Sequence, residues 1–201
     1  MNKIICLLIV VLGCIACSQE QRGPHYGTEE ECRYDNMQLN GEWEKIVAEA
    51  AKTPVQSLAC QKVVRLAQYR LKQAGPEAFM DCLANTKEAL TSETGAIMMS
   101  DVYMQLGFAN LAQRAAFEAM VETSSEKIKQ RALQRLTETA IITKQYELAR
   151  KYIAILEENG VNRQWLKTMK PMAEHPEAIL QNPTFKSLQE QHEKIEDQFF
   201  M

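Results

Sequence analysis

Residues 98–120 read MMSDVYMQLGFANLAQRAAFEAM, and this stretch decides the fold. Apolar residues recur at helical spacing on both sides of Gly107, and glycine readily takes the backbone conformation that ends a helix. The stretch therefore predicts a helix, a tight break at Gly107 and a second helix that folds back on the first. Similar units precede and follow it, so we expect an all-α chain of stacked antiparallel helix hairpins.

The composition supports helix throughout and one domain, or at most two. The chain has 201 residues, of which 46% are hydrophobic, 24% charged and only 7% aromatic, with 8 glycines and 6 prolines. A chain of this length buries a sizeable core. The formal net charge is -3, which lacks the basic excess needed to neutralise phosphates, so we expect no nucleic-acid partner.

The first residues indicate export. A short positive segment, Met1 to Lys3, precedes an apolar run over residues 4–17. A helix of that length rises only about 21 Å, which is short of the roughly 30 Å bilayer core. Residues 1–17 therefore have the character of a signal segment, and the polar residues 18–27 that of a tether.

Two cysteines near the end of this segment each follow a small residue: Gly13 precedes Cys14, and Ala16 precedes Cys17. This pattern resembles the bacterial lipoprotein signal, the lipobox, in which a peptidase cuts before the cysteine and the thiol carries diacylglycerol. We predict lipidation at Cys17, because Ser18 follows it and the apolar run then has the usual length, with Cys14 as the alternative. The other interpretations are a cleavable signal without lipid and a plain membrane helix.

Export would place three further cysteines, Cys32, Cys60 and Cys82, in a compartment that permits disulfides. Cys32 and Cys60 would pair if they lay on neighbouring helices. The alternative is that all three are small apolar residues buried on helix faces. No pair has metal-binding spacing such as C-x-x-C.

Caps and breaks divide the rest of the chain into helices. Thr28 before three glutamates is typical of a helix start, and Asn159-Gly160 of a helix end. Pro76 suits a first helical turn. Besides the central pair, we expect helices over residues 28–39, 42–52, 55–73, 126–143, 146–159 and 185–199, with shorter ones from Pro76 and over 165–171.

The hairpin turns recur at a regular interval. The matching residues are Ile46, Phe79, Ala112 and Ala149. Their spacings of 33, 33 and 37 residues resemble the length of the tetratricopeptide repeat. Residues 28–160 thus resemble a tetratricopeptide-like α-solenoid, with residues 161–201 as capping helices. The early Trp-x-x-Leu-Gly signature of that family is absent and Lys144 replaces a turn glycine, so an irregular helical bundle is the alternative.

A second resemblance covers residues 43–171. It rests on QSLACQKVVRLA, LGFANLAQRAAFEAM and RLTETAIITKQYELARKYIAILE, which are similar to the soluble repeat region of an uncharacterised family of Bacteroidetes envelope proteins. In that family the region commonly follows membrane helices, whereas a lipobox-like signal stands in their place in this chain. The family has no assigned activity, so the resemblance implies a fold and an envelope location only.

Motifs of catalysis are absent from the sequence. The histidines are His25, His175 and His192, and none belongs to an H-E-x-x-H pair. There is no phosphate-binding glycine loop and no G-x-S-x-G elbow. We therefore expect no catalytic residues, no metal and no cofactor; an enzyme is the third hypothesis, with His175 between Glu174 and Glu177 as its one candidate.

The most basic predicted helix carries Lys62, Arg65, Arg70 and Lys72, which we interpret as outward-facing. This face is either solvated or accepts an acidic peptide, an anionic glycan or lipid headgroups. We predict an envelope lipoprotein, anchored by lipid at the outer membrane, that binds a protein partner as an interaction scaffold through the groove of a tetratricopeptide-like array. The alternative is a glycan- or small-ligand-binding surface lipoprotein. The predicted groove residues are Arg65, Tyr69, Met99, Tyr103, Arg131 and Arg135.

Overall fold

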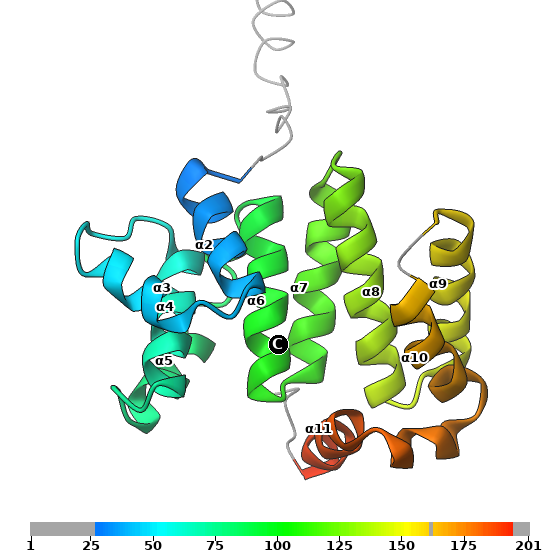
Figure 1. Ribbon diagram of the computed structural model, residues 1–201. Helices are drawn as coiled ribbons and strands as arrows, with labels where there is room; N and C mark the ends of the chain where they lie inside the picture. The colour runs from blue at the N-terminus through cyan, green and yellow to red at the C-terminus, as the bar shows by residue number, and fades with distance from the viewer. Residues whose placement is uncertain (1–26, 161–162, 195–201) are drawn as a thin grey trace, which may run out of the picture.

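The computed structural model describes residues 27–160 and 163–194. Within these two ranges every element of secondary structure is a helix (Figure 1), which confirms the all-α prediction. In chain order the helices are α2 (Glu29–Leu39), α3 (Trp43–Ala50), α4 (Leu58–Arg70), α5 (Pro76–Leu83), α6 (Glu93–Leu106), α7 (Ala109–Glu122), α8 (Glu126–Ile142), α9 (Tyr146–Glu158), α10 (Arg163–Glu174), the short 3₁₀ helix η1 (Pro176–Gln181) and α11 (Pro183–Lys194).

Several helices of the described chain begin at a side-chain cap. At α2, the Thr28 hydroxyl accepts from the Glu31 N–H at 3.1 Å, and the Glu31 carboxylate accepts from the Thr28 N–H at 3.0 Å. Such a reciprocal pair satisfies two backbone donors that the first turn leaves open. Ser92 caps α6 and Ser125 caps α8 in the same sense. The predicted starts at Thr28 and at residue 126 are confirmed.

Turns with left-handed backbone separate the central helices. Gly107 ends α6 with φ 85°, a value that costs glycine little because it has no Cβ. At the turn between α8 and α9 the left-handed residue is Lys144, with φ 61°. The predicted breaks at both residues are confirmed, and at Lys144 the chain takes the conformation without a glycine.

Helix α6 is the most enclosed element, because all its residues except Gln105 are buried. It packs against α7, α4 and α2, and α7, α8 and α9 follow side by side in chain order (Figure 1). One continuous apolar core runs from Tyr34 on α2 through Tyr103 on α6 to Phe185 on α11.

Two helices differ from the predicted bounds. Helix α4 spans residues 58–70 rather than 55–73. Helix α10 does not end at Pro171 but continues through it to Glu174. An internal proline removes one backbone hydrogen bond, yet the core-facing residues Met169, Met172 and Ala173 stay buried on both sides of Pro171, so packing holds the helix together.

The three cysteines of the described chain are free thiols. Cys60 and Cys82 are buried, as one interpretation predicts, whereas Cys32 is exposed. The predicted signal segment and both candidate lipidated residues, Cys17 and Cys14, lie outside the described residues, as do residues 195–201. In the part that is described, no helix has the length and apolar character needed to cross a bilayer.

Candidate binding groove

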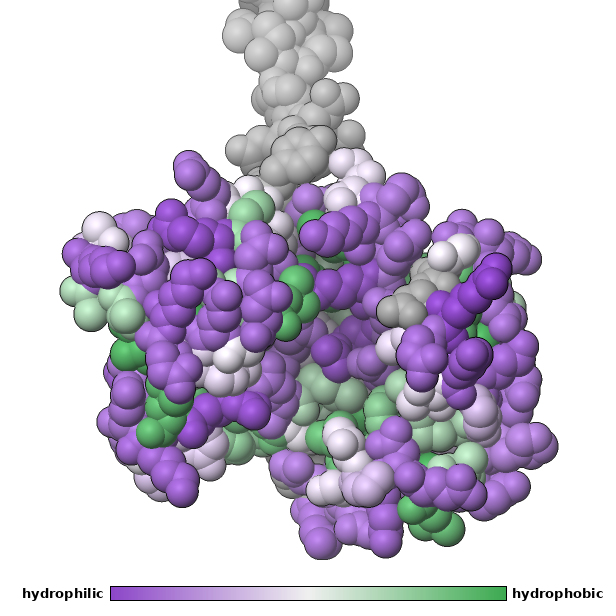
Figure 2. Space-filling model, in the orientation of Figure 1, coloured by the Kyte–Doolittle hydropathy of each residue, from purple (hydrophilic) through white to green (hydrophobic). Residues whose placement is uncertain are grey.

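A polar groove of about 490 Å³ opens where α2, α6, α8 and α10 meet. Figure 2 shows this face hollowed between the α2 and α10 sides, with mainly hydrophilic residues around the hollow. Ligand sites commonly have volumes of roughly 300–1,000 Å³. The lining residues are Gln38, Leu39, Asp101, Gln105, Lys127, Gln130, Arg131, Gln134, Arg135, Glu138 and Trp165.

One face of α8 forms a wall of this groove. Its six lining residues follow one another at spacings of three, one, three, one and three, which is the pattern of a single helix face. They are Lys127, Gln130, Arg131, Gln134, Arg135 and Glu138. The α8 face therefore presents charges and amides in alternation along its length.

Asp101 on α6 lies at the floor of the groove between two arginines of α8. Arg131 donates to its Oδ2 atom, and Arg135 donates to its Oδ1 atom at 2.5 Å. Burial acts to raise the pKa of Asp101, but the neighbouring charges of Arg135 and Arg131 outweigh burial and hold the pKa below its usual range. Asp101 is therefore a charged carboxylate that binds α6 to α8.

The ion pairs continue from this floor to the two sides of the groove. Arg131 also donates to Asp35 Oδ2 on α2 at 2.8 Å. Arg135 also donates to Glu138 at 2.6 Å, and Glu138 accepts from the indole N–H of Trp165 on α10 at 3.0 Å. A single polar network thus joins α2, α6, α8 and α10.

Polar capacity remains unused in the groove. The side-chain amides of Gln130 and Gln134, both partly exposed, make no hydrogen bond within the described chain. Three buried atoms also lack a partner in the described chain: Asp35 Oδ1 and Arg135 Nε of the network, and Oε1 of the lining residue Gln38. Unpaired polar atoms raise the free energy of a buried site, so an occupant with hydrogen-bonding groups has donors and acceptors to meet.

A second hollow of about 530 Å³ adjoins the groove and shares three of its lining residues, Gln105, Arg135 and Glu138. Its other side is contributed by Met104 and by α11. This extension adds apolar residues to the lining, because Met104 and Phe185 are core residues and Leu188 packs against the same core.

Of the residues predicted to line a groove, the structure brings Arg131 and Arg135 together in this one. The prediction is wrong for Met99 and Tyr103, whose side chains are 0% and 1% exposed. Helix α6 is covered by α4, α7 and α2, so positions 99 and 103 face the core. Asp101, the residue of α6 that holds both arginines, was not predicted; an acid within an otherwise apolar helix was the available signal.

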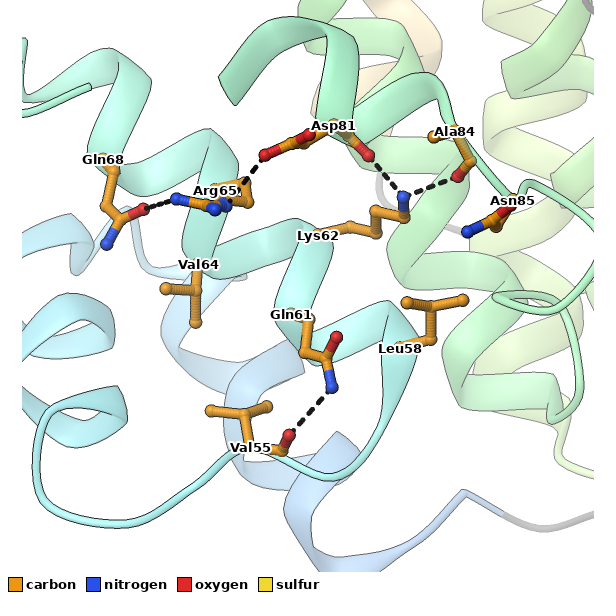
Figure 3. Close-up of a pocket in the computed structure, with 10 residues that line it drawn as sticks. All are labelled: Val55, Leu58, Gln61, Lys62, Val64, Arg65, Gln68, Asp81, Ala84 and Asn85. Carbon is orange, nitrogen blue, oxygen red and sulfur yellow. Dashed lines mark hydrogen bonds and ion pairs between the residues drawn. The ribbon is translucent and has the colours of Figure 1, made fainter. Parts of the chain in front are cut away.

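Arg65 and Tyr69 lie on α4, outside the groove. Figure 3 shows Arg65 in a separate hollow of about 380 Å³, between Asp81 at 3.1 Å and Gln68 at 3.2 Å. Tyr69 is 40% exposed, and its ring centroid lies 5.9 Å from that of Phe79. The two residues therefore belong to a different surface from Arg131 and Arg135.

The predicted basic face of α4 is largely satisfied internally. Lys62, interpreted from the sequence as outward-facing, is buried, and its ammonium donates to the Asp81 and Ala84 carbonyls at the end of α5 (Figure 3). Arg70 donates to Gln105 at 2.6 Å and lies 4.9 Å from the centre of the Trp43 ring. The prediction that Lys62 faces outward is therefore wrong. The carbonyls at the C-terminus of α5 attract its cation inward.

Candidates for metal binding or catalysis are sparse in residues 27–160 and 163–194. No group of three or more His, Cys, Asp or Glu side chains is placed to hold a metal ion there. His175 is largely exposed beside Glu177 at 3.9 Å. The groove, by contrast, brings polar groups from four helices to one hollow.

The fold and the groove define an all-helical protein with a polar groove spanning four helices. The chain belongs to the family of unknown function DUF6057, whose family model matches residues 1–201. Neither the curated proteins nor the solved structures contain a match to it.

Proposed function

We propose that the protein is an envelope lipoprotein that acts as a protein–protein interaction scaffold, with the groove between α2, α6, α8 and α10 as its binding surface. The observation that carries the proposal is that the groove joins four helices through one ion-pair network and still leaves the Gln130 and Gln134 amides unused. A rigid floor with free hydrogen-bonding groups above it suits recognition rather than turnover. The proposal gives the protein no catalytic role.

A tetratricopeptide-like stack of helix hairpins is part of the proposal. It is supported by the packing of α6 on α7, α7 on α8 and α8 on α9. Left-handed residues at Gly41, Gly107 and Lys144, each between two helices, add further support. In such a stack the first helices of successive hairpins line one face; α2, α6 and α8 line the groove, whereas α4 does not.

The proposed anchor is a lipid on Cys17, or on Cys14, that holds the protein at the outer membrane of a Gram-negative, Bacteroidetes-type envelope. Its support is the lipobox-like sequence that ends the apolar run over residues 4–17. The mass of the mature N-terminal peptide tests it: we expect a diacylglycerol-modified cysteine. Unmodified Cys17 and Cys14 would remove the anchor and leave the groove to be tested separately.

Crosslinking in intact cells followed by affinity capture tests the scaffold. We expect one stoichiometric protein partner, which is lost from the Gln134→Trp variant because a large side chain then fills the groove. Gln113→Trp is the matched control: Gln113 is a partly exposed glutamine on α7, outside the groove. Absence of any partner with the native protein, or equal loss with both variants, would contradict the proposal.

One observation favours a second candidate, a glycan- or small-ligand-binding lipoprotein. Trp165 lines the groove beside the free amides, and an aromatic ring with amides around it suits a sugar. A soluble oligosaccharide that raises the melting temperature of the native protein but not of Gln134→Trp would favour this candidate.

A further inference from the structure

The charges of the groove are engaged with one another rather than with solvent. Arg131 is paired with Asp35 and Asp101, and Arg135 with Asp101 and Glu138. Lys127, exposed at one end of the α8 face, is the lining cation without an ion pair in the described chain. The groove therefore offers little net charge to an occupant, and a strongly acidic or basic ligand would have to break pairs that are already made.

The free groups of the groove are amides, and their spacing is regular. Gln130 and Gln134 lie four residues apart on α8, which places their Cβ atoms about 6 Å apart on one face. In an extended polypeptide, alternate residues lie about 6.7 Å apart on one side. Each glutamine amide has both a donor and an acceptor, as each peptide group has, so the two amides match every second peptide group of an extended segment.

The length of the α8 face limits the occupant. From Lys127 to Glu138 the helix rises about 16 Å, the length of about five extended residues. Beyond Glu138 the adjoining hollow is lined by the apolar residues Met104, Phe185 and Leu188, with Thr184 and Ser187 beside them. That hollow suits one large apolar side chain at the end of the segment.

From this arrangement we propose that the groove takes an extended polypeptide segment of near-zero net charge, about five residues long, whose main chain pairs with Gln130 and Gln134 and whose terminal apolar side chain enters the hollow beside Met104. This inference rests on the proposed scaffold function and specifies its ligand. Main-chain pairing makes the groove tolerant of sequence at most positions and nearly insensitive to salt.

A random library of linear dodecapeptides, displayed on phage and selected against the full chain in detergent micelles, tests the inference. We expect selected peptides to be near neutral and to share one large apolar residue. Between about 50 and 500 mM salt the dissociation constant of each synthetic peptide should change by less than about twofold. Replacing the shared apolar residue by alanine should weaken binding about tenfold or more.

The double variant Gln130→Ala, Gln134→Ala supplies the control on the protein side. It should weaken the selected peptides about tenfold or more, because two hydrogen bonds are lost, while Gln113→Ala on α7 leaves them unchanged. Each of the three substitutions removes a glutamine amide that has no hydrogen bond in the described chain, two of them in the groove and one outside it.

Selected peptides that are rich in Asp and Glu and bind salt-dependently would overturn the neutral ligand. Selected peptides that bind the double variant equally well would overturn the role of the two glutamines. A partner captured in cells and lost from Gln134→Trp, with no linear peptide selected, would overturn this inference and leave the scaffold function standing.

Discussion

Arg131 on α8 and Asp35 on α2 stand 96 residues apart in the chain and form an ion pair of 2.8 Å. The same guanidinium holds Asp101 on α6, so one arginine connects three helices. Both of its partners are shielded from solvent, with side chains 15% and 9% exposed. The shape of the groove therefore depends on a charge network rather than on apolar packing alone.

Removing the central carboxylate should destabilise the fold strongly. In Asp101→Asn the largely buried side chains of Arg131 and Arg135 lose their common charged partner and keep only Asp35 and Glu138. Breaking a buried pair typically costs about 3–5 kcal/mol, and the unfolding free energy should fall by up to that amount. Urea unfolding measures the change. The control is Glu147→Gln, which breaks the exposed Lys151–Glu147 pair of 2.8 Å and should leave the midpoint unchanged. Equal effects would contradict a structural role of Asp101.

Acid should weaken the fold through Asp101. Its pKa in the folded protein is below the usual value because Arg135 and Arg131 outweigh burial. The unfolded chain then binds the proton more tightly, so stability is lost as pH falls from about 4 through the lower folded pKa. Burial raises the pKa of Asp35, despite Arg131, and its contribution has the opposite sign. In urea melts, Asp101→Asn should lose stability less steeply than the native protein below about pH 4. Asp35→Asn should lose it more steeply as the pH falls towards about 4, where the raised pKa lets the folded native protein bind the proton of Asp35 first.

Lys62 should be needed for the end of α5. Its buried ammonium donates to the Asp81 carbonyl and, at 2.5 Å, to the Ala84 carbonyl. Lys62→Met keeps the apolar stem but leaves both carbonyls without this donor, and an unsatisfied buried acceptor costs about 1–3 kcal/mol. Hydrogen exchange should show faster opening of residues 80–84. Lys72→Met, at an exposed position just beyond α4, should leave exchange there unchanged.

Local features of the fold were predictable because each depends on neighbouring residues. The capping box at Thr28 and Glu31 and the break at Gly107 involve side chains within three residues of the backbone groups that they serve. The helical period likewise predicted the two helices on either side of Gly107. Helix ends were less accurate, as at α10, because packing of Met172 carries the helix beyond Pro171.

The groove was only partly predictable, because its network is long-range. No feature of the neighbouring sequence pairs Arg131 with Asp35, which lies 96 residues away. Met99 and Tyr103 were expected to be exposed because the first helix of a hairpin was expected to line the groove, yet both are buried. The sequence does repeat Gln-Arg at 130–131 and 134–135. A polar stripe of this kind usually faces solvent. Here Asp101 on the neighbouring helix α6 binds both arginines, and the stripe becomes one wall of the groove.

The turn at Gly107 provides a test of how α11 is held against the core. At φ 85° any other residue is strained, and an added Cβ would come within 2.1 Å of the Gln191 amide. That amide donates to the Leu106 carbonyl at 3.0 Å, which ties α11 to the end of α6. Gly160 has a similar φ of 69° but nothing within 4 Å of an added Cβ.

Both Gly→Ala substitutions should cost about 1–2 kcal/mol in backbone strain, and Gly107→Ala should additionally displace Gln191. We therefore expect a lower melting temperature for Gly107→Ala than for Gly160→Ala, with faster hydrogen exchange in α11 in the first variant alone. Equal melting temperatures and unchanged exchange in α11 would show that Gln191 does not hold this helix in place.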